Sequence, residues 1–349
     1  MDLSAKRFNS RAQVTLFIFL AMIVAVAIVA YFNLSGNISS NDKNSSFVSN
    51  YPPLPNNKVC TACCSVCDQV KNSKNSETSA GSGTSTDSKN ANEYRYYPPV
   101  DLGDIGDYPP GTYDFAPERK ASSGNWIVDD VESHFDDTSK LTFLNDPDIR
   151  VRAHEHIHHL NFESSYGDDI TQSLYLLNSK MIDLYTVSMD RFVTSSYVPP
   201  SLQGSSFDTY ISRRSTAGDP ENVLYPFDEW VAYYSGDLAA FQNRDWDVVY
   251  SNLIFFREME VYALCTGMAL KDKYPQYWES EDGIKTRKFM QWQLDRSQKF
   301  FNLVAKELGG DYETSTAYEY AQTVKTSPDA DNLRRFSLAE FKYDWATVT

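Results

Sequence analysis

Hydrophobic and polar positions divide the chain into three parts. Residues 14–32 read VTLFIFLAMIVAVAIVAYF, an apolar run without a charged residue. Residues 33–117 are dominated by Ser, Asn, Thr, Gly, Lys and Pro, with few apolar residues apart from tyrosines. A segment that buries little apolar surface cannot offset the loss of chain entropy on folding. We therefore expect residues 33–117 to form a disordered stalk and residues 118–349 to form the folded domain.

The pattern within residues 118–349 predicts a mainly α fold with a small β element. Two short segments have the composition of strands, 125–128 and 141–144. Longer segments have helical periodicity, and the expected helices are 170–185, 227–241, 246–274 and 284–308. A further helix is expected to start at Asn145-Asp-Pro147, because Asn caps helix N-termini and Pro suits the first turn.

The apolar run at residues 14–32 is predicted to be a single transmembrane helix, since about 20 apolar residues cross a bilayer core. Lys6, Arg7 and Arg11 precede it, and no basic residue follows until Lys43. The positive-inside rule therefore places residues 1–13 in the cytoplasm. A cleavable signal peptide is the alternative, although its apolar core is usually shorter, about 7–15 residues. We expect a single-pass cell-membrane protein with its folded domain on the extracytoplasmic face.

The start of the apolar run resembles that of archaeal type IV pilin-like proteins. Residues 11–17 read Arg-Ala-Gln-Val-Thr-Leu-Phe, and the resemblance implies cleavage before Gln13 that leaves the apolar helix attached. Phe17 stands where pilins usually carry Glu. The resemblance covers this helix alone, and it implies a pilus-like or other surface assembly as a partner.

Charge and cysteine usage narrow the function classes. The net charge of −15, without a stripe of Lys and Arg, argues against a nucleic-acid partner. Four of the five cysteines, Cys60, Cys63, Cys64 and Cys67, form a CxxCCxxC cluster. Thiols outside a cell tend to oxidise, so two disulfides are one interpretation and a four-thiolate metal site is the other. Cys265 lies in an apolar helical stretch and is expected to be a buried free thiol.

Candidate chemistry is concentrated in residues 153–160, which hold four of the five histidines. His154 and His158 are four residues apart and Glu155 follows the first, which is the pattern HExxH. Positions i and i+4 lie on one face of a helix, so the two imidazoles can converge on one Zn²⁺ ion. His156 and His159 point away from that face. Glu155 is the expected general base, because zinc lowers the pKa of bound water to about 7.

HExxH on a helix resembles the zincin metallopeptidases, and the resemblance implies zinc-dependent hydrolysis of peptide bonds on a zincin-like α+β fold. A catalytic zinc usually has three protein ligands, and the branches of the zincin family differ in the third ligand. Asn161 and Ser164 stand where the metzincin branch carries Gly and His, so that branch is excluded. Residues 224–233, Leu-Tyr-Pro-Phe-Asp-Glu-Trp-Val-Ala-Tyr, resemble the gluzincin helix in which Glu is followed three residues later by Ala. This likeness assigns Glu229 as the third ligand.

Several neighbouring residues complete the predicted site. Asp168 and Asp169 are the alternative third ligands, since they follow His158 as in the branch with an aspartate ligand. Asp228 is expected to orient a ligand imidazole, and the small Ala232 lets the two helices approach. An oxyanion needs a hydrogen-bond donor, and the sequence does not select one among Tyr210, Tyr225, Tyr233, Tyr234, Arg213 and Arg214.

The sequence thus predicts a membrane-anchored, extracytoplasmic zinc metallopeptidase that cleaves peptide or protein substrates. Two alternatives stay open. One is a non-catalytic surface or pilus-associated protein with a structural metal or none. The other is a zinc amidase of cell-wall polymers, because a metal-bound water attacks other polarised carbonyls as well.

Overall fold

The computed structural model describes residues 107–137, 141, 143–165, 171–212 and 223–348. All of them belong to one compact unit of the chain. The predicted cytoplasmic segment 1–13, the anchor 14–32 and the four clustered cysteines lie outside the described residues. Within the described part, no helix is long and apolar enough to cross a membrane.

The described residues are mostly helical, with one small sheet, as the sequence predicted. The sheet is three-stranded and antiparallel, in the order β1-β3-β2. In chain order the elements are β1 (Tyr113–Asp114), α3 (Trp126–Glu132), α4 (Ile149–Ser164), β2 (Thr171–Tyr175), β3 (Lys180–Tyr185), the short helical turns η2 (Arg191–Tyr197), η3 (Pro200–Leu202) and η4 (Asp208–Ser212), α5 (Tyr225–Gln242), α6 (Trp246–Lys273), α7 (Pro275–Trp278), α8 (Glu281–Leu308), α9 (Gly310–Glu313), α10 (Thr316–Thr326), η5 (Pro328–Ala330), α11 (Asp331–Phe341) and η6 (Trp345–Thr347).

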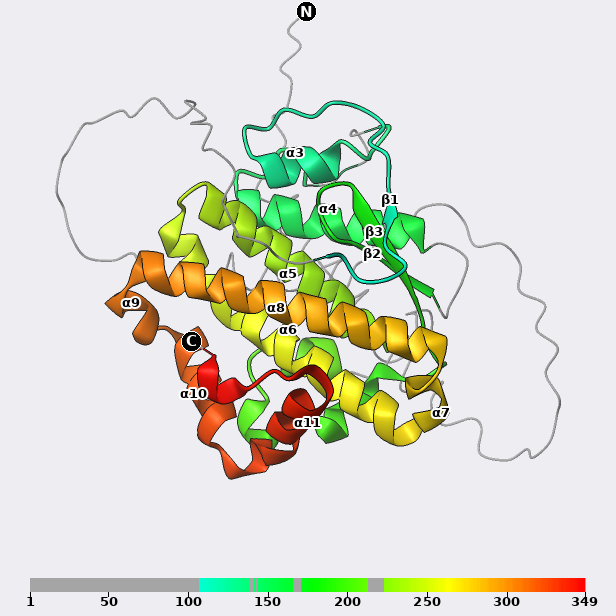
Figure 1. Ribbon diagram of the computed structural model, residues 1–349. Helices are drawn as coiled ribbons and strands as arrows, with labels where there is room; N and C mark the ends of the chain where they lie inside the picture. Colours follow the sequence, from blue (N-terminus) through cyan, green and yellow to red (C-terminus); the bar gives the residue numbers. More distant parts are fainter. Residues whose placement is uncertain (1–106, 138–140, 142, 166–170, 213–222, 349) are drawn as a thin grey trace, which may run out of the picture. The chain divides into compact units, whose positions relative to one another are not determined.

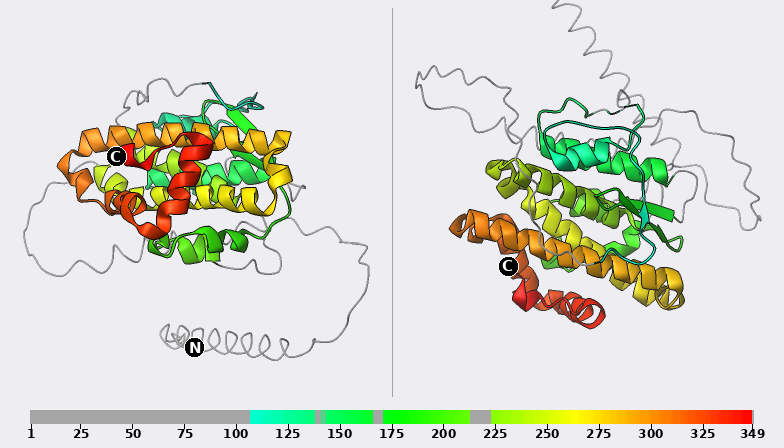
Figure 2. Two further views of the ribbon diagram at one scale, coloured as in Figure 1. Left: turned by 60° about the horizontal axis from the view of Figure 1, so that its bottom comes forward. Right: turned by 45° about the horizontal axis from the view of Figure 1, so that its top comes forward.

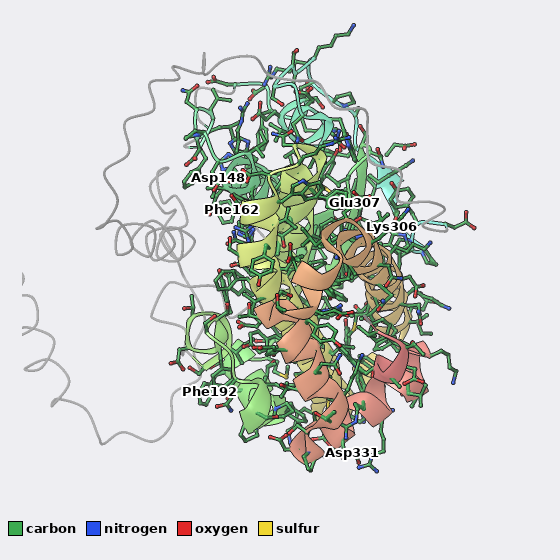
Figure 3. The ribbon with its side chains drawn as sticks, turned by 90° about the vertical axis from the view of Figure 1, so that its left-hand side faces the viewer. Asp148, Phe162, Phe192, Lys306, Glu307 and Asp331 are labelled. Carbon is green, nitrogen blue, oxygen red and sulfur yellow. The ribbon has the colours of Figure 1, made fainter. Side chains whose placement is uncertain are left out.

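Helices α4, α5 and α6 lie side by side, and α8 packs lengthwise against α5 and α6 (Figures 1 and 2). Figure 3 shows Asp148 and Phe162, near the two ends of α4, on one side of the unit and Lys306 and Glu307 of α8 on the other, with α5 between them. The hairpin of β2 and β3 packs against α4, α5 and α8. Large aromatic side chains such as Trp230, Phe256 and Phe300 fill the space between the helices. The central helix α5 is therefore buried along nearly its whole length.

Most of the long predicted helices are confirmed. Segments 227–241, 246–274 and 284–308 correspond to α5, α6 and α8, with ends no more than three residues away. The histidine helix is also present as α4, but its N-cap is Asp148 and not Asn145. The Asp148 carboxylate accepts hydrogen bonds from the backbone N–H groups of Arg150 and Val151.

The prediction of a helix over residues 170–185 is wrong, because this segment forms the hairpin of β2 and β3. Leu177, Asn178 and Ser179 between the strands have φ values of 68°, 54° and 55°, the left-handed region that reverses the chain. Ser173 and Asp183 face each other across the strands, and Ser173 Oγ donates to Asp183 Oδ1 at 2.7 Å. Apolar runs this short fit either a helix or a strand, and the partner strand decides.

Both strands predicted after residue 118 are also wrong. Residues 126–128 start α3, because Asn125 caps the helix by accepting from the backbone N–H groups of Ile127 and Val128. The segment 141–144 contains a turn in which Leu144 N donates to Leu141 O at 3.3 Å. β-branched and aromatic composition indicated strands here, but a local cap and a local turn satisfy the backbone instead.

The folded unit includes residues 107–117, which the sequence analysis assigned to the stalk. Tyr113 of β1 pairs with Met181 of β3, and Phe115 N donates to Ser179 O at 2.9 Å. The ring of Tyr108 lies 5.4 Å from that of Trp292 on α8. This segment is ordered by strand pairing and ring packing with residues far along the chain, which its own Pro- and Gly-rich composition could not indicate.

Helices α4 and α5 approach most closely at Gly236. A Cβ atom at this position would lie 2.9 Å from the carbonyl oxygen of Arg150 and 3.2 Å from the Cβ of His154. At the same crossing, Arg150 Nε donates to Asp237 Oδ1 at 2.6 Å, and both side chains are buried. The missing side chain at Gly236 therefore sets the spacing between the helix with the histidines and the helix with Glu229.

We predict that Gly236→Ala lowers the free energy of unfolding by about 1–2 kcal/mol, even after the roughly 1 kcal/mol gained from the higher helix propensity of Ala. The added methyl group meets a backbone carbonyl, which cannot rotate aside. Chemical denaturation measures the change. Gly310→Ala is the matched control, because a Cβ there meets no atom within 4 Å. Equal stability of Gly236→Ala and the wild type would contradict the close approach.

Candidate metal centre

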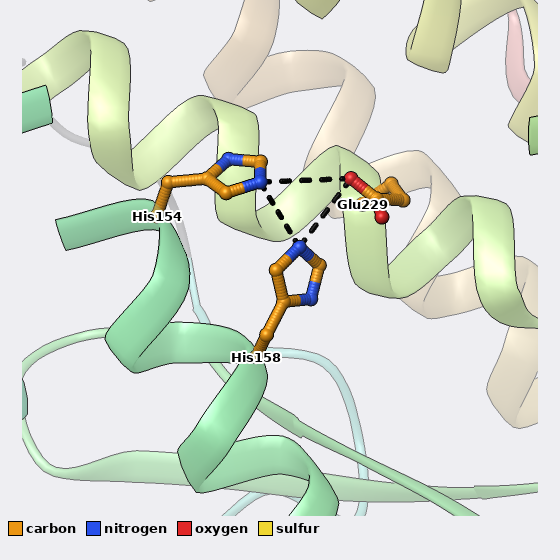
Figure 4. Close-up of side chains that lie close together, drawn as sticks. All are labelled: His154, His158 and Glu229. Atoms are coloured by element: carbon orange, nitrogen blue, oxygen red, sulfur yellow. Dashed lines mark hydrogen bonds and ion pairs between the residues drawn. The ribbon is translucent and has the colours of Figure 1, made fainter. Parts of the chain in front are cut away.

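Three side chains predicted as zinc ligands converge between α4 and α5 (Figure 4). His154 and His158 lie one turn apart on α4, and Glu229 points at them from the N-terminal part of α5. The Nε2 atoms of the two histidines are 3.0 Å apart. Glu229 Oε2 lies 3.7 Å from the Nε2 atom of His154 and 3.3 Å from that of His158. The structure thus brings together residues separated by a β-hairpin and several short turns.

These separations suit one metal ion. Ligand atoms about 2.1 Å from a tetrahedral centre lie roughly 3.4 Å from one another. All three side chains are buried, with His154 and His158 each 7% exposed and Glu229 1% exposed. Apart from the two imidazoles, neither carboxylate oxygen of Glu229 has a hydrogen-bond partner in the described part of the chain. A buried group of acceptor atoms is costly unless a cation or a donor satisfies it, so these residues could hold a metal ion.

The orientation of His158 is fixed by a chain of hydrogen bonds. Its Nδ1 atom lies 2.8 Å from Asp228 Oδ2, the contact that the sequence led us to expect. Asn161 Nδ2 donates to the other oxygen of Asp228 at 2.6 Å. Asn161 Oδ1 in turn accepts from the backbone N–H of Tyr175 in β2 at 2.7 Å. In the neutral form of His158, Asp228 therefore keeps the proton on Nδ1, so that the Nε2 lone pair faces His154 and Glu229.

Sequence reasoning missed the role of Asn161, which it used only to exclude a zincin branch. The signal that could have found it is spacing, because position 161 lies three residues after His158 on the same face of α4. The amide of Asn161 contacts one carboxylate oxygen of Asp228, and the imidazole of His158 contacts the other. The hairpin that sequence reasoning misassigned as a helix thus supports the candidate ligands through Tyr175.

Burial and the neighbouring charges shift the pKa values of His154 and His158 in opposite directions. Burial alone would lower the pKa of His158, but the charges of Asp228 and Glu229 raise this pKa well above its usual value. Burial lowers the pKa of His154 well below its usual value, and the charges of His158 and Arg150 act in the same direction. A proton therefore resides on His158 rather than on His154, and a metal ion must displace it in order to bind.

The remaining histidines of α4 have other partners. His156 Nδ1 lies 3.2 Å from Glu132 Oε1 on α3, and Arg152 donates to both oxygens of that carboxylate at 2.6 and 2.8 Å. His159 Nε2 lies 3.1 Å from Glu163 Oε1, one turn along α4. His156 thus ties α4 to α3, and His159 takes part in a surface pair.

Glu155 and two tyrosines lie close to the candidate ligands. Glu155 is buried on α4 next to His154. The ring of Tyr233 is 4.5 Å from that of His154, and the hydroxyl oxygens of Tyr233 and Tyr210 are 3.0 Å apart. Burial raises the pKa of both phenols well above the usual value, and the charge of Glu229 adds to the effect. Both phenols therefore keep their protons and can donate hydrogen bonds.

Of the other oxyanion candidates, Tyr234 lies against α8, Tyr225 packs beside Tyr210, and two arginines are not described. The ring of Tyr234 lies 4.0 Å from the guanidinium of Arg296. Tyr225 packs against Tyr210, with ring centroids 6.0 Å apart. The oxyanion candidates Arg213 and Arg214 and the alternative metal ligands Asp168 and Asp169 lie outside the described residues.

A buried carboxylate on α6 supports the turn that carries Tyr210. Glu258 Oε1 accepts from the backbone N–H of Ser205 at 3.0 Å, and Glu258 Oε2 accepts from that of Ser206 at 2.8 Å. These two residues precede η4, the turn that contains Tyr210. A Cβ on Gly204 would lie 2.1 Å from Glu258 Oε1, so the missing side chain lets the carboxylate approach. The sequence offered no signal for this contact, because the residues are far apart along the chain.

Comparison of the chain with known protein families, with characterised proteins and with solved structures found no match.

We predict that the full chain binds a single zinc ion, and that His154→Ala, His158→Ala and Glu229→Ala each weaken binding by more than the roughly 10–100-fold expected when only an outer hydrogen-bond partner is lost. Each substitution removes one of three converging ligand atoms. Elemental analysis and competition with a chelator measure the metal. His159→Ala is the control, since its imidazole pairs with Glu163. Loss of zinc in the histidine variants alone would contradict the assignment of Glu229 and favour Asp168 or Asp169.

We predict that Asp228→Ala weakens metal binding about 10–100-fold without abolishing it, because Asp228 fixes the tautomer of His158 but donates no ligand atom itself. The same chelator competition measures the effect. Asp183→Ala serves as a control, because Asp183 accepts a hydrogen bond within the hairpin from Ser173. An unchanged affinity in Asp228→Ala would show that the orientation of His158 does not depend on this carboxylate.

Proposed function

We propose that this protein is a zinc-dependent hydrolase of the zincin type that cleaves peptide bonds. The observation that carries the proposal is the convergence of His154, His158 and Glu229, three side chains of the types and separations that a catalytic zinc requires. The resemblance of residues 154–158 and 224–233 to the gluzincin motifs supports the same assignment. Glu155, next to His154 on α4, stands where a zincin carries its general base.

Each residue of the centre has a role in such a reaction. A bound zinc ion would polarise the scissile carbonyl and lower the pKa of a water molecule. Glu155 takes the proton of that water and passes it to the leaving nitrogen, so that one carboxylate acts as base and then as acid. Tyr233 and Tyr210 are the proposed donors to an oxyanion, because the ring of Tyr233 packs against that of His154 and its hydroxyl lies 3.0 Å from that of Tyr210.

The proposed setting of the enzyme is the outer face of a cell membrane. Residues 14–32 would anchor the chain, and the low-complexity segment that follows would let the folded unit reach substrates around its anchor. Peptides or proteins near the surface are the proposed substrates. Cell-wall polymers with amide bonds are the alternative, since the same centre polarises either carbonyl.

A structural metal site is the second candidate. The observation in its favour is burial, since a catalytic zinc must admit a water molecule and a substrate, while the three side chains here are at most 7% exposed. In that case the ion would fasten α4 to α5, and Glu155 would have no chemical role. The surface or pilus-associated protein predicted as an alternative from the sequence corresponds to this candidate.

We predict that Glu155→Gln keeps the zinc ion but lowers hydrolysis roughly 10²–10⁴-fold, the usual contribution of a general acid–base. The substitution preserves the size of the side chain and removes its ability to accept a proton. Activity is measured with peptide and wall-polymer libraries side by side, and metal content is measured in the same preparations. Glu163→Gln, an exposed position on the same helix, is the control. Full activity in Glu155→Gln, or a zinc-loaded wild type inactive on both libraries, would reject the hydrolase and favour the structural metal.

A further inference from the structure

A buried arginine, Arg296, lies on α8, which packs on the opposite side of α5 from the helix that carries the candidate metal ligands. Arg296 of α8 is 1% exposed. Its guanidinium carbon lies 4.0 Å from the ring centroid of Tyr234 on α5 and 4.2 Å from that of Trp292 on α8. Two aromatic rings therefore pack against the guanidinium, and its N–H groups are the atoms that can bind a polar partner. Figure 3 shows α8 and α4 on opposite sides of α5, so this arginine is separate from His154 and His158.

The edges of this guanidinium are only partly satisfied. Nη1 donates to the carbonyl oxygen of Leu176 at 3.1 Å. Nε and Nη2 are buried and have no hydrogen-bond partner in the described part of the chain. Burial lowers the pKa of Arg296 to about 10, and among the described residues only the phenols of Tyr234 and Tyr108 oppose the shift. The other fully buried arginine of the core, Arg257, has the carboxylate of Glu260 at 2.7 Å. No carboxylate among the described residues does the same for Arg296, and an uncompensated buried charge is costly.

Neighbouring residues on α8 add further unpaired donors. Gln293 and Trp292 precede Arg296 by three and four residues, so they are its neighbours on the helix surface. Both amide atoms of Gln293 and the indole nitrogen of Trp292 are buried and have no partner among the residues that the structure describes. Together with Nε and Nη2 of Arg296, this makes four donors and one acceptor within about one turn of helix. Such an excess of donors beside a positive charge calls for an acceptor with a negative charge.

We propose that the Nε–Nη2 edge of Arg296 binds a small carboxylate anion. This edge presents two parallel N–H groups, the arrangement that matches the two oxygens of a planar carboxylate. A carboxylate brings only acceptors and a negative charge, whereas a water molecule brings as many donors as acceptors and no charge. The anion holds α8 against α5 and against the β2–β3 hairpin, because Tyr234, Trp292 and Leu176 surround the guanidinium. This binding site does not depend on the proposed hydrolase.

Formate is the probe that tests the proposal. The full chain, dialysed free of carboxylate buffers, is unfolded thermally in increasing sodium formate, with sodium chloride adjusted to hold the ionic strength constant. A ligand that binds only the folded protein raises the unfolding midpoint progressively with the logarithm of its concentration. We expect this rise in the wild type and its loss in Arg296→Lys, which keeps the positive charge but lacks the Nε–Nη2 edge. Gln293→Leu should reduce the response.

Controls separate this site from general effects of the anion. Arg287→Lys on the same helix should respond to formate as the wild type does, because the guanidinium of Arg287 already lies 3.7 Å from the carboxylate of Glu340 and 3.9 Å from that of Glu279. Isotope-labelled formate should give a bound NMR signal with the wild type and none with Arg296→Lys. No rise of the midpoint in the wild type, or an equal rise in Arg296→Lys, would overturn the proposal and leave buried water as the partner of Arg296. Neither readout requires a metal ion or an activity, so a failure of the proposed hydrolase would not affect the result.

Discussion

The close approach of α4 and α5 at Gly236 is the contact on which the candidate metal centre depends. His154 contributes its Cβ to this contact and its imidazole to the centre, and Gly236 lies about two turns after Glu229 on the facing helix. The ion pair of Arg150 with Asp237 fastens the same crossing. A wider spacing would separate Glu229 from the histidines, because the three side chains meet in the space between the two helices (Figure 4).

Burial of charge is the second constraint, and the fold meets it by pairing. Arg150 is paired with Asp237, and Arg257 with Glu260, all four of them buried. Pairing with an opposite charge lowers the cost of burying these side chains, because an unpaired ion loses its hydration without compensation. Two buried clusters are not neutralised in this way by the described residues. His154, His158 and Glu229 present acceptor atoms that suit a cation, and Arg296 presents donors that suit an anion.

Tertiary contacts, not local pattern, explain the errors in the sequence-based predictions. Residues 170–185 contain apolar runs too short to distinguish a helix from a strand. Pairing with β1 and packing on α4 and α8 stabilise the hairpin that the segment forms. Asn125 caps a helix at a segment whose composition favours a strand. In α5, α6 and α8 the apolar periodicity continues over many turns, and there the prediction agrees with the structure to within a few residues.

The sequence by itself indicated helices α5, α6 and α8 and the pair His154 and His158, because long apolar periodicity and the spacing of four residues have a local geometric meaning. Glu229 was indicated only by the resemblance of its segment to the gluzincin helix. The sequence could also indicate Asp228, which is adjacent to Glu229. Only the tertiary structure decided that Asn161 and Tyr175 support Asp228, and that Tyr233 packs against His154 and contacts Tyr210. It also decided that Nε and Nη2 of Arg296 have no partner among the described residues. These relations join residues from separate elements, and hydrogen-bond partners and burial are properties of the packed chain.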